Sequence, residues 1–340
     1  MLSCSGSGKM EPVQNLADSL RAVLGRLRDG ESREKTNFNA PNFWETLGQT
    51  FKVISQEATK MSLAFSKPPM PSHEDNQKLS DGLLNSVLAA ATVYYSLPKV
   101  QGITLRKTVR EAVADVIEGT IQLVDVILNS RIQSLSQAQL VSTGSVWEAC
   151  DQFEQLPKDN KAAVVVQVSR YLAVVKDAIE EVEQAAAGED DPFNDILDDD
   201  ETGGRCNQDT YWSEADRKLL GPCLGLMKAS KACLKKVLGA LKAQGKVDTD
   251  EHVAQLDDLA DVTQEISPSV DELALSLYPP MNHAAVRLNG AQLASVLKKV
   301  LEIARASHVC TEEESSWIQF LSGAVDHNME KIKNFTQHVV

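Results

Sequence analysis

The chain has 340 residues, of which 43% are hydrophobic and only 5% aromatic, and its formal net charge is −14. This length and apolar content suffice for two domains, and the scarcity of aromatic residues favours helices packed by Leu, Val and Ala over a β-sandwich. The acidic balance argues against nucleic acid or an anionic membrane as a direct partner.

The first residues show no apolar stretch of the kind that a signal peptide needs. Residues 1–10 are rich in Ser and Gly, so we expect a disordered N-terminus. A short helix is predicted around Leu16 to Leu27. From Phe43 to Phe65 apolar residues recur at steps of four and three, which predicts one long helix that ends before Pro68.

Further helical stripes follow in the first half of the chain. They cover residues 79–94, 105–126 and 164–185. Ser72 is placed to cap the first of them. Between residues 130 and 144 the pattern fades, and only a short piece near Trp147 remains before Pro157. We expect these helices to pack together as one bundle over residues 11–187.

An acidic tract separates the two halves of the chain. It carries eight acidic side chains and no basic one: Glu189, Asp190, Asp191, Asp195, Asp198, Asp199, Asp200 and Glu201. Neighbouring like charges about 7 Å apart repel by about 0.6 kcal/mol in water, and the few apolar residues nearby offset little of the cost of ordering. Residues 188–210 are therefore predicted to be a solvated acidic linker.

Helical periodicity resumes at Ser213 and continues to the C-terminus. The stripes cover residues 220–241, 256–266, 270–277, 293–303 and 317–332, with breaks at prolines. No run alternates with period two, as a half-buried strand would. The fold class predicted is all-α, with two up-and-down helical bundles, the second over residues 211–340, joined by the acidic linker.

The residues that usually carry chemistry form no recognisable site. No Cys-x-x-Cys pair is present, and none of the six histidines follows a glutamate by three residues, as helical di-iron sites require. We expect the cysteines to be free thiols. The sequence therefore predicts no enzyme, no metal and no cofactor.

Two short patterns suggest regulation instead. The stretch Arg217-Lys218-Leu219-Leu220 fits the Arg-x-Leu-apolar pattern of cyclin-docking peptides, which makes Arg217 and Lys218 candidate partner-binding residues, although Leu220 also lies on a buried stripe. Ser213 and Ser267 are candidate phosphorylation sites. Both also look like helix N-caps, and we favour capping for both.

Several unusual stretches carry a resemblance to a known family. They are residues 94–99 (YYSLPK), 101–107 (QGITLRK), 157–163 (PKDNKAA), 229–236 (ASKACLKK) and 266–281 (ISPSVDELALSLYPPM). Together they closely resemble the cyclin-D-binding protein family, also called the Grap-adaptor and cyclin-D interacting protein, or Maid. The resemblance extends over nearly the whole chain, but its motifs are mostly turns and core positions, so it transfers no functional residue.

The resemblance implies a non-enzymatic regulator found in the cytoplasm and the nucleus. Such a protein binds D-type cyclin and a Grap-type adaptor and restrains the cell cycle by opposing cyclin-dependent kinase activity and Rb phosphorylation. It also implies an Id-like inhibitor of helix-loop-helix transcription factors, and a fold similar to the bundles of vinculin, catenin and talin. The alternative reading is a vinculin-like or catenin-like scaffold that links cytoskeletal or signalling components.

Overall fold

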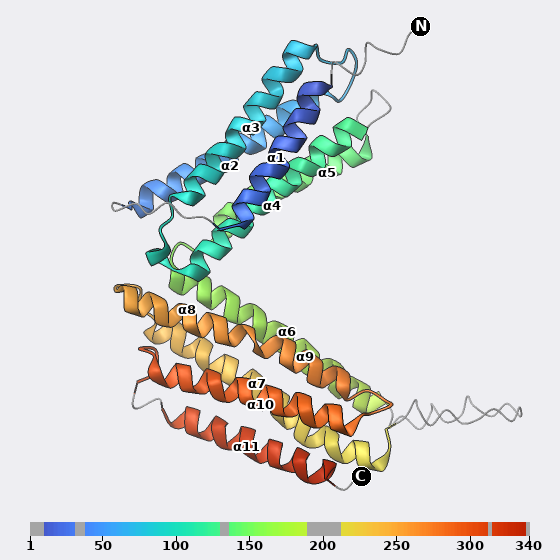
Figure 1. Cartoon of the computed structure of the whole chain (residues 1–340), viewed down its shortest axis with the longest axis vertical. Coiled ribbons are helices and arrows are strands. Elements are labelled where there is room, and N and C mark those ends of the chain that lie inside the picture. The colour runs from blue at the N-terminus through green and yellow to red at the C-terminus, as the bar shows by residue number, and fades with distance from the viewer. Residues whose placement is uncertain (1–9, 31–37, 130–135, 189–211, 312–314, 338–340) are drawn as a thin grey trace, which may run out of the picture. The chain divides into compact units, whose positions relative to one another are not determined.

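The computed structural model describes residues 10–30, 38–129, 136–188, 212–311 and 315–337. Within these ranges the regular structure is helical without a strand, which confirms the all-α prediction. The predicted disordered N-terminus, except for its last residue, and nearly all of the predicted acidic linker lie outside the described residues. By packing, the chain divides into two units, Met1–Asp159 and Asn160–Val340 (Figure 1).

The first unit is a helical bundle. They are α1 (Glu11–Arg28), α2 (Ala40–Ala64), α3 (His73–Tyr95), α4 (Ile103–Asn129) and α5 (Gln137–Asp151), with short 3-10 helices η1 (Lys99–Gln101) and η2 (Gln152–Gln155). Helix α1 packs between α3 and α4, and α5 packs between α2 and α4. The apolar stripes predicted for α1 to α4 are buried in this core. Ser72 caps α3, since its hydroxyl accepts a hydrogen bond from the Asp75 N–H.

Helix α5 is longer than its weak apolar pattern predicted, because its buried face is largely polar. Gln139 donates through its amide to the carbonyl of Ser62 at 2.7 Å, and Thr143 donates to the Ser62 hydroxyl at 2.8 Å. These bonds join α5 to α2 in the interior. Meanwhile Leu140 and Trp147 lie on the exposed side of the helix. A helix whose polar residues face inward escapes a search for apolar periodicity.

The second unit is also a helical bundle, and one of its long helical segments is interrupted. Its helices are α6 (Asn160–Gly188), α7 (Glu214–Gln244), α8 (Asp250–Gln264), α9 (Ile266–Ser276), α10 (His283–Ala306) and α11 (Ser316–Thr336). Glu265 is both the C-cap of α8 and the N-cap of α9, so these two helices follow each other as one interrupted rod. Helix α6 packs on α7, α8 and α9, while α10 packs on α9 and α11.

The placement of α6 corrects the predicted bundle of residues 11–187. This helix contributes Val164, Val168, Val175 and other residues to the core that α7 to α11 share, and Glu183 pairs with Lys228 of α7 at 2.7 Å. The packing boundary therefore lies at Asp159, not beside the acidic tract. Periodicity shows that one face of α6 is buried, but it does not show which neighbour covers that face.

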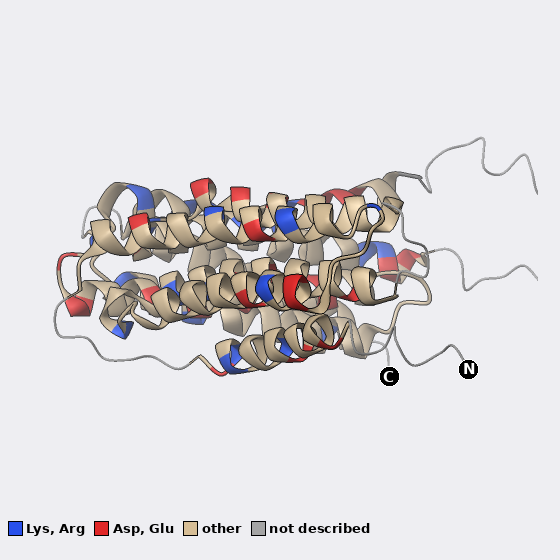
Figure 2. Cartoon of the chain, turned by 90° about the horizontal axis from the view of Figure 1, so that it is seen from above, with Lys and Arg blue, Asp and Glu red and all other residues tan. Residues whose placement is uncertain are grey.

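Charged residues of both signs lie along the outer faces of the helices (Figure 2). Most ion pairs that the described residues form connect exposed side chains, which contribute little to stability. Among the described helices, none is long and apolar enough to cross a membrane.

Candidate functional site

The N-terminus of α7 is held by a reciprocal cap. The Asp216 N–H donates to the Ser213 hydroxyl at 3.1 Å, and the Ser213 N–H donates to the Asp216 carboxylate at 2.9 Å. This capping box confirms the predicted role of Ser213 as N-cap. The hydroxyl oxygen thus already serves the helix end, and phosphorylation of Ser213 stays a prediction.

The same carboxylate connects α7 to the start of α10. His283 Nε2 lies 2.5 Å from the second oxygen of Asp216, and His283 Nδ1 is buried without a hydrogen-bond partner among the described residues. Because an ionised carboxylate can only accept a hydrogen bond, this contact requires a proton on Nε2. Burial raises the pKa of Asp216, but the hydrogen bonds from His283 and Ser213 outweigh this effect, and the pKa lies below its ordinary value. The residue before the cap is also bonded: the Trp212 indole N–H donates a hydrogen bond to the Leu277 carbonyl at 2.6 Å.

The predicted cyclin-docking pattern lies in the first two turns of α7. Arg217 and Lys218 are exposed, and Lys218 forms an ion pair with Glu214 at 2.9 Å. Leu219 is fully buried and Leu220 is 8% exposed, both within the core of the second unit. The pattern therefore cannot insert its leucines into a partner while α7 is folded. This confirms the expectation that Leu220 is a core residue.

Ser267 is not an N-cap, which corrects the second capping prediction. The N-cap of α9 is Glu265, and Ser267 lies inside the first turn with only 8% of its surface exposed. The break falls there because Pro268 lacks an N–H and its ring would clash with the carbonyl four residues earlier, that of Gln264, the last residue of α8. A kinase could reach Ser267 only if this turn opened, so its phosphorylation stays a prediction that requires local unfolding.

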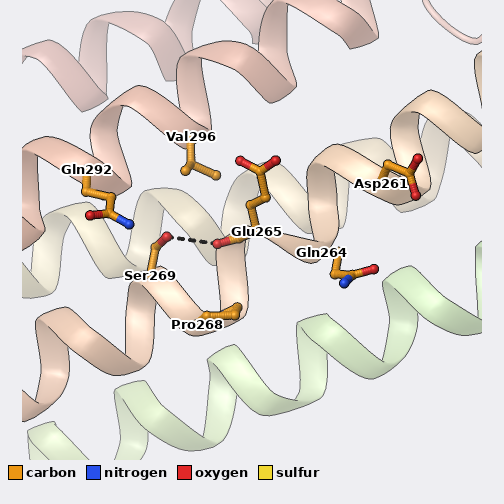
Figure 3. A pocket seen from close by; sticks show the side chains of 7 residues that line it. All are labelled: Asp261, Gln264, Glu265, Pro268, Ser269, Gln292 and Val296. Atoms are coloured by element: carbon orange, nitrogen blue, oxygen red, sulfur yellow. Dashed lines mark hydrogen bonds between the residues drawn. The ribbon is translucent and has the colours of Figure 1, made fainter.

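A groove lies beside the α8–α9 break, next to the predicted site residue Ser267. We call it the α9–α10 groove; it encloses about 470 Å³ and is lined by Asp261, Gln264, Glu265, Pro268, Ser269, Gln292 and Val296. Figure 3 shows that Gln292 and Val296 project from α10 and that the other five belong to the α8–α9 rod. The Ser269 hydroxyl donates a hydrogen bond to the Glu265 carbonyl at 2.8 Å, which satisfies a backbone acceptor at the helix break.

The α9–α10 groove presents groups that can bind polar ligands. It contains carboxylates and amides that can pair with cations and peptide groups, but neither a histidine nor a thiol. Within the described part of the chain, no cluster of three or more His, Cys, Asp or Glu side chains could hold a metal ion. Sequence inspection missed the groove because its two walls lie on separate helices.

The cysteines that the structure describes in the cores are inert. Cys150, Cys223 and Cys233 are outside any disulfide, as expected, and burial raises the pKa of each thiol to about 12. A thiol with so high a pKa carries almost no thiolate at neutral pH and is a poor nucleophile.

Comparison with known proteins places these features in a family. The family model described as Grap2 and cyclin-D-interacting, N-terminal, matches residues 46–188, and its C-terminal counterpart matches residues 197–302, which include the α9–α10 groove. The boundary between the two models follows α6, whereas the packing boundary precedes it.

Full-length relatives agree with the family models. The chain is 77% identical over 328 residues to the Cyclin-D1-binding protein 1 homolog of Xenopus laevis, an alignment that covers 96% of this chain and 99% of that protein. It is 54% identical to the Danio rerio homolog, with 97% of each chain covered. It is 47% identical to Cyclin-D1-binding protein 1 of Homo sapiens, with 96% of this chain and 94% of the human protein covered. The chain therefore belongs to the Grap2 and cyclin-D-interacting family.

Proposed function

We propose that this protein is a non-enzymatic regulator that binds D-type cyclin and restrains cell-cycle progression by reducing cyclin-dependent kinase activity and Rb phosphorylation. One observation supports the cyclin part most strongly. The relatives named Cyclin-D1-binding protein 1 or its homolog match over most of their length, with 96% of this chain and 99% of the Xenopus laevis protein aligned. Activity in the cytoplasm and the nucleus, and binding of helix-loop-helix factors and a Grap-type adaptor, belong to the same proposal.

The fold favours recognition by the intact bundles. A dimerising helix-loop-helix protein needs two amphipathic helices that are available to a partner. In the described ranges, the apolar stripes of α2, α4, α7 and α10 are buried in their own cores. Detaching such a helix would cost several kcal/mol or more of packing free energy. We therefore propose that helix-loop-helix factors also bind to outer surfaces of the folded protein.

A binding experiment with the full chain tests this proposal. The immobilised protein would be titrated with purified D-type cyclin, and with A-type cyclin as the control, by biolayer interferometry. We expect saturable binding of the D-type cyclin in the micromolar range or tighter and much weaker binding of the control. Absence of saturable binding up to about 50 μM would contradict the proposal.

The second candidate function is a scaffold of the vinculin or catenin kind. It is favoured by the architecture, because each unit packs long helices into a bundle that offers extended outer faces to a partner. Co-sedimentation of the full chain with filamentous actin, together with an unbiased pull-down, distinguishes the candidates. Actin or adhesion partners without a D-type cyclin would favour the scaffold.

A further inference from the structure

The connection between α10 and α11 is bonded to the connection between α7 and α8 through one histidine. His308 follows the C-cap of α10, and its Nε2 lies 3.0 Å from the backbone nitrogen of Lys246, which precedes α8. The side-chain oxygen of Gln255, on α8, lies 2.8 Å from the His308 backbone nitrogen and 2.7 Å from His308 Nδ1. We call His308, Lys246 and Gln255 the His308 bridge. It joins His308 to residues that are 53 and 62 positions away in the sequence.

The backbone groups of the bridge fix the position of the proton on the histidine ring. The His308 backbone N–H can only donate, so the end of the Gln255 amide that faces it is the oxygen. The nitrogen end of that amide donates to the Glu251 carboxylate at 3.4 Å, which agrees with this orientation. The same oxygen lies against Nδ1, which must therefore carry a proton. The Lys246 N–H is also a donor, so Nε2 must offer a lone pair, and His308 is a neutral imidazole.

A second proton on His308 is incompatible with the bridge. It can add only at Nε2, where the new N–H would face the N–H of Lys246, and two donors cannot form a hydrogen bond. The other neutral tautomer does not avoid this conflict, because moving the proton from Nδ1 to Nε2 creates the same pair of donors. The bond to Lys246 therefore exists only while Nε2 is free of a proton.

The charges around His308 determine when the second proton binds. The ring centroid of His252 lies 4.2 Å from that of His308, and His252 Nδ1 is 2.5 Å from the Asp248 carboxylate. Burial, followed by repulsion from His252, lowers the pKa of His308. Asp248 opposes this shift and Lys246 adds to it. The bridge is therefore intact at neutral pH and is lost as the pH falls through the lowered pKa of His308.

Both connections keep other contacts when the bridge opens. The Lys161 ammonium group of α6 donates to the Lys242 carbonyl at 3.0 Å, and the Gly245 N–H donates to the Leu241 carbonyl at 3.0 Å, so the end of α7 stays bonded. In the α10–α11 connection, Val309 is 1% exposed and belongs to the core of the second unit. Opening of the bridge is therefore a local change that removes no apolar contact from this core.

We propose that the His308 bridge is a proton-operated switch in the second unit. At neutral pH it holds the α10–α11 connection against the α7–α8 connection. A proton bound at Nε2 releases the two connections from each other while the core of the unit stays folded, and the imidazolium turns toward water, away from Lys246 and His252. This switch goes beyond the proposed function and does not depend on which partner the chain binds.

Nuclear magnetic resonance of the full chain tests the switch. Long-range proton–nitrogen spectra of the histidine side chains show which ring nitrogen carries the proton. We expect His308 to be neutral with its proton on Nδ1 at pH 7.5, and to become the imidazolium in a titration to pH 5 with a midpoint below about 6.5. The exchange rate of the Lys246 amide, corrected for the intrinsic effect of pH, should rise by up to about tenfold per pH unit as the pH falls, because opening binds one proton. Amides of the buried stripe of α7, such as that of Leu234, should stay protected.

Three variants that replace histidine by glutamine separate the bridge from other titrating groups. His308→Gln removes the site of the proton, so the rise in Lys246 exchange at acidic pH should disappear. His252→Gln removes the neighbouring repulsion, so the rise should remain and the His308 midpoint should move to higher pH. His327→Gln is the matched control, because His327 is exposed on α11, and it should leave both measurements unchanged.

A proton on Nε2 of neutral His308 at pH 7.5 would overturn the proposal, since that nitrogen could not then accept a hydrogen bond from Lys246. A rise in Lys246 exchange that persists in His308→Gln would also overturn it, because another group would then be responsible. A loss of protection that the α7 core shares would show that the whole unit unfolds instead of opening locally. The position of the proton is read on the unchanged chain and does not depend on the folding of a variant.

Discussion

The burial of the two leucines at the start of α7 determines whether this segment is a docking peptide or part of the core. Leu219 is fully buried, and replacing a buried leucine by alanine costs about 2 to 5 kcal/mol. For a unit of the size of residues 160–340, each kcal/mol lowers the melting temperature by about 2 to 4 °C. Leu219→Ala should therefore lower the melting transition of the second unit by about 4 to 20 °C.

The assay combines melting and binding. Circular dichroism at 222 nm gives the melting temperature, and titration with D-type cyclin at about 15 °C, where the variant is still folded, gives the affinity. Arg217→Ala is the matched control, because this exposed residue adds little to stability but would anchor a docked peptide electrostatically. We expect Leu219→Ala to lose stability while keeping affinity, and Arg217→Ala to keep both. Loss of cyclin binding by Leu219→Ala without a lower melting temperature would refute the core assignment, whereas loss by Arg217→Ala alone would identify a contact on the surface of the folded helix.

Two further predictions concern polar contacts between segments that lie far apart in the sequence. His308 accepts a hydrogen bond at Nε2 from the Lys246 N–H at 3.0 Å, and burial, followed by repulsion from His252, lowers its pKa in the folded protein. Between the two pKa values the unfolded chain binds more protons than the folded one, so the stability should fall as the pH drops below about 6.5 and level off below the lowered pKa. Melting curves from pH 7.5 to 5.5 should therefore show a smaller decrease in melting temperature for His308→Gln than for the unchanged chain. An equal decrease would exclude His308 as the cause. Gln139→Leu leaves the Ser62 carbonyl without its interhelical donor and should destabilise the first unit by about 1 to 3 kcal/mol in urea unfolding, whereas an unchanged midpoint would show that the bond contributes nothing net.

Much of the fold could be predicted because apolar periodicity is strong in most helices. The stripes from Phe43 to Phe65 and from Leu220 to Leu241 are buried as expected, and the cap residue Ser213 marks the true start of α7. Helix α5 was underestimated because its interior face holds Gln139 and Thr143 in place of apolar residues.

Other features depend on tertiary packing that a stripe does not encode. Periodicity could not assign α6 to the second unit. Ser267 was predicted to be a cap because a serine before a proline has the local pattern of a helix start, but the helix begins two residues earlier than that pattern indicates. The α9–α10 groove brings Glu265 beside Val296 from separate helices, so no single segment reveals it. A signal was nevertheless present, since Pro268 marks the helix break beside which the groove forms.

Recognition of partners by intact bundles is tested most directly by hydrogen–deuterium exchange of the full chain, free and bound to D-type cyclin. The buried stripes of α2, α4, α7 and α10 predict that binding protects amides only at surface segments and leaves the exchange of these helices as slow as before. Faster exchange along the whole of any one of these helices in the complex would show that it detaches to pair with the partner, and that result would contradict recognition by the folded surface.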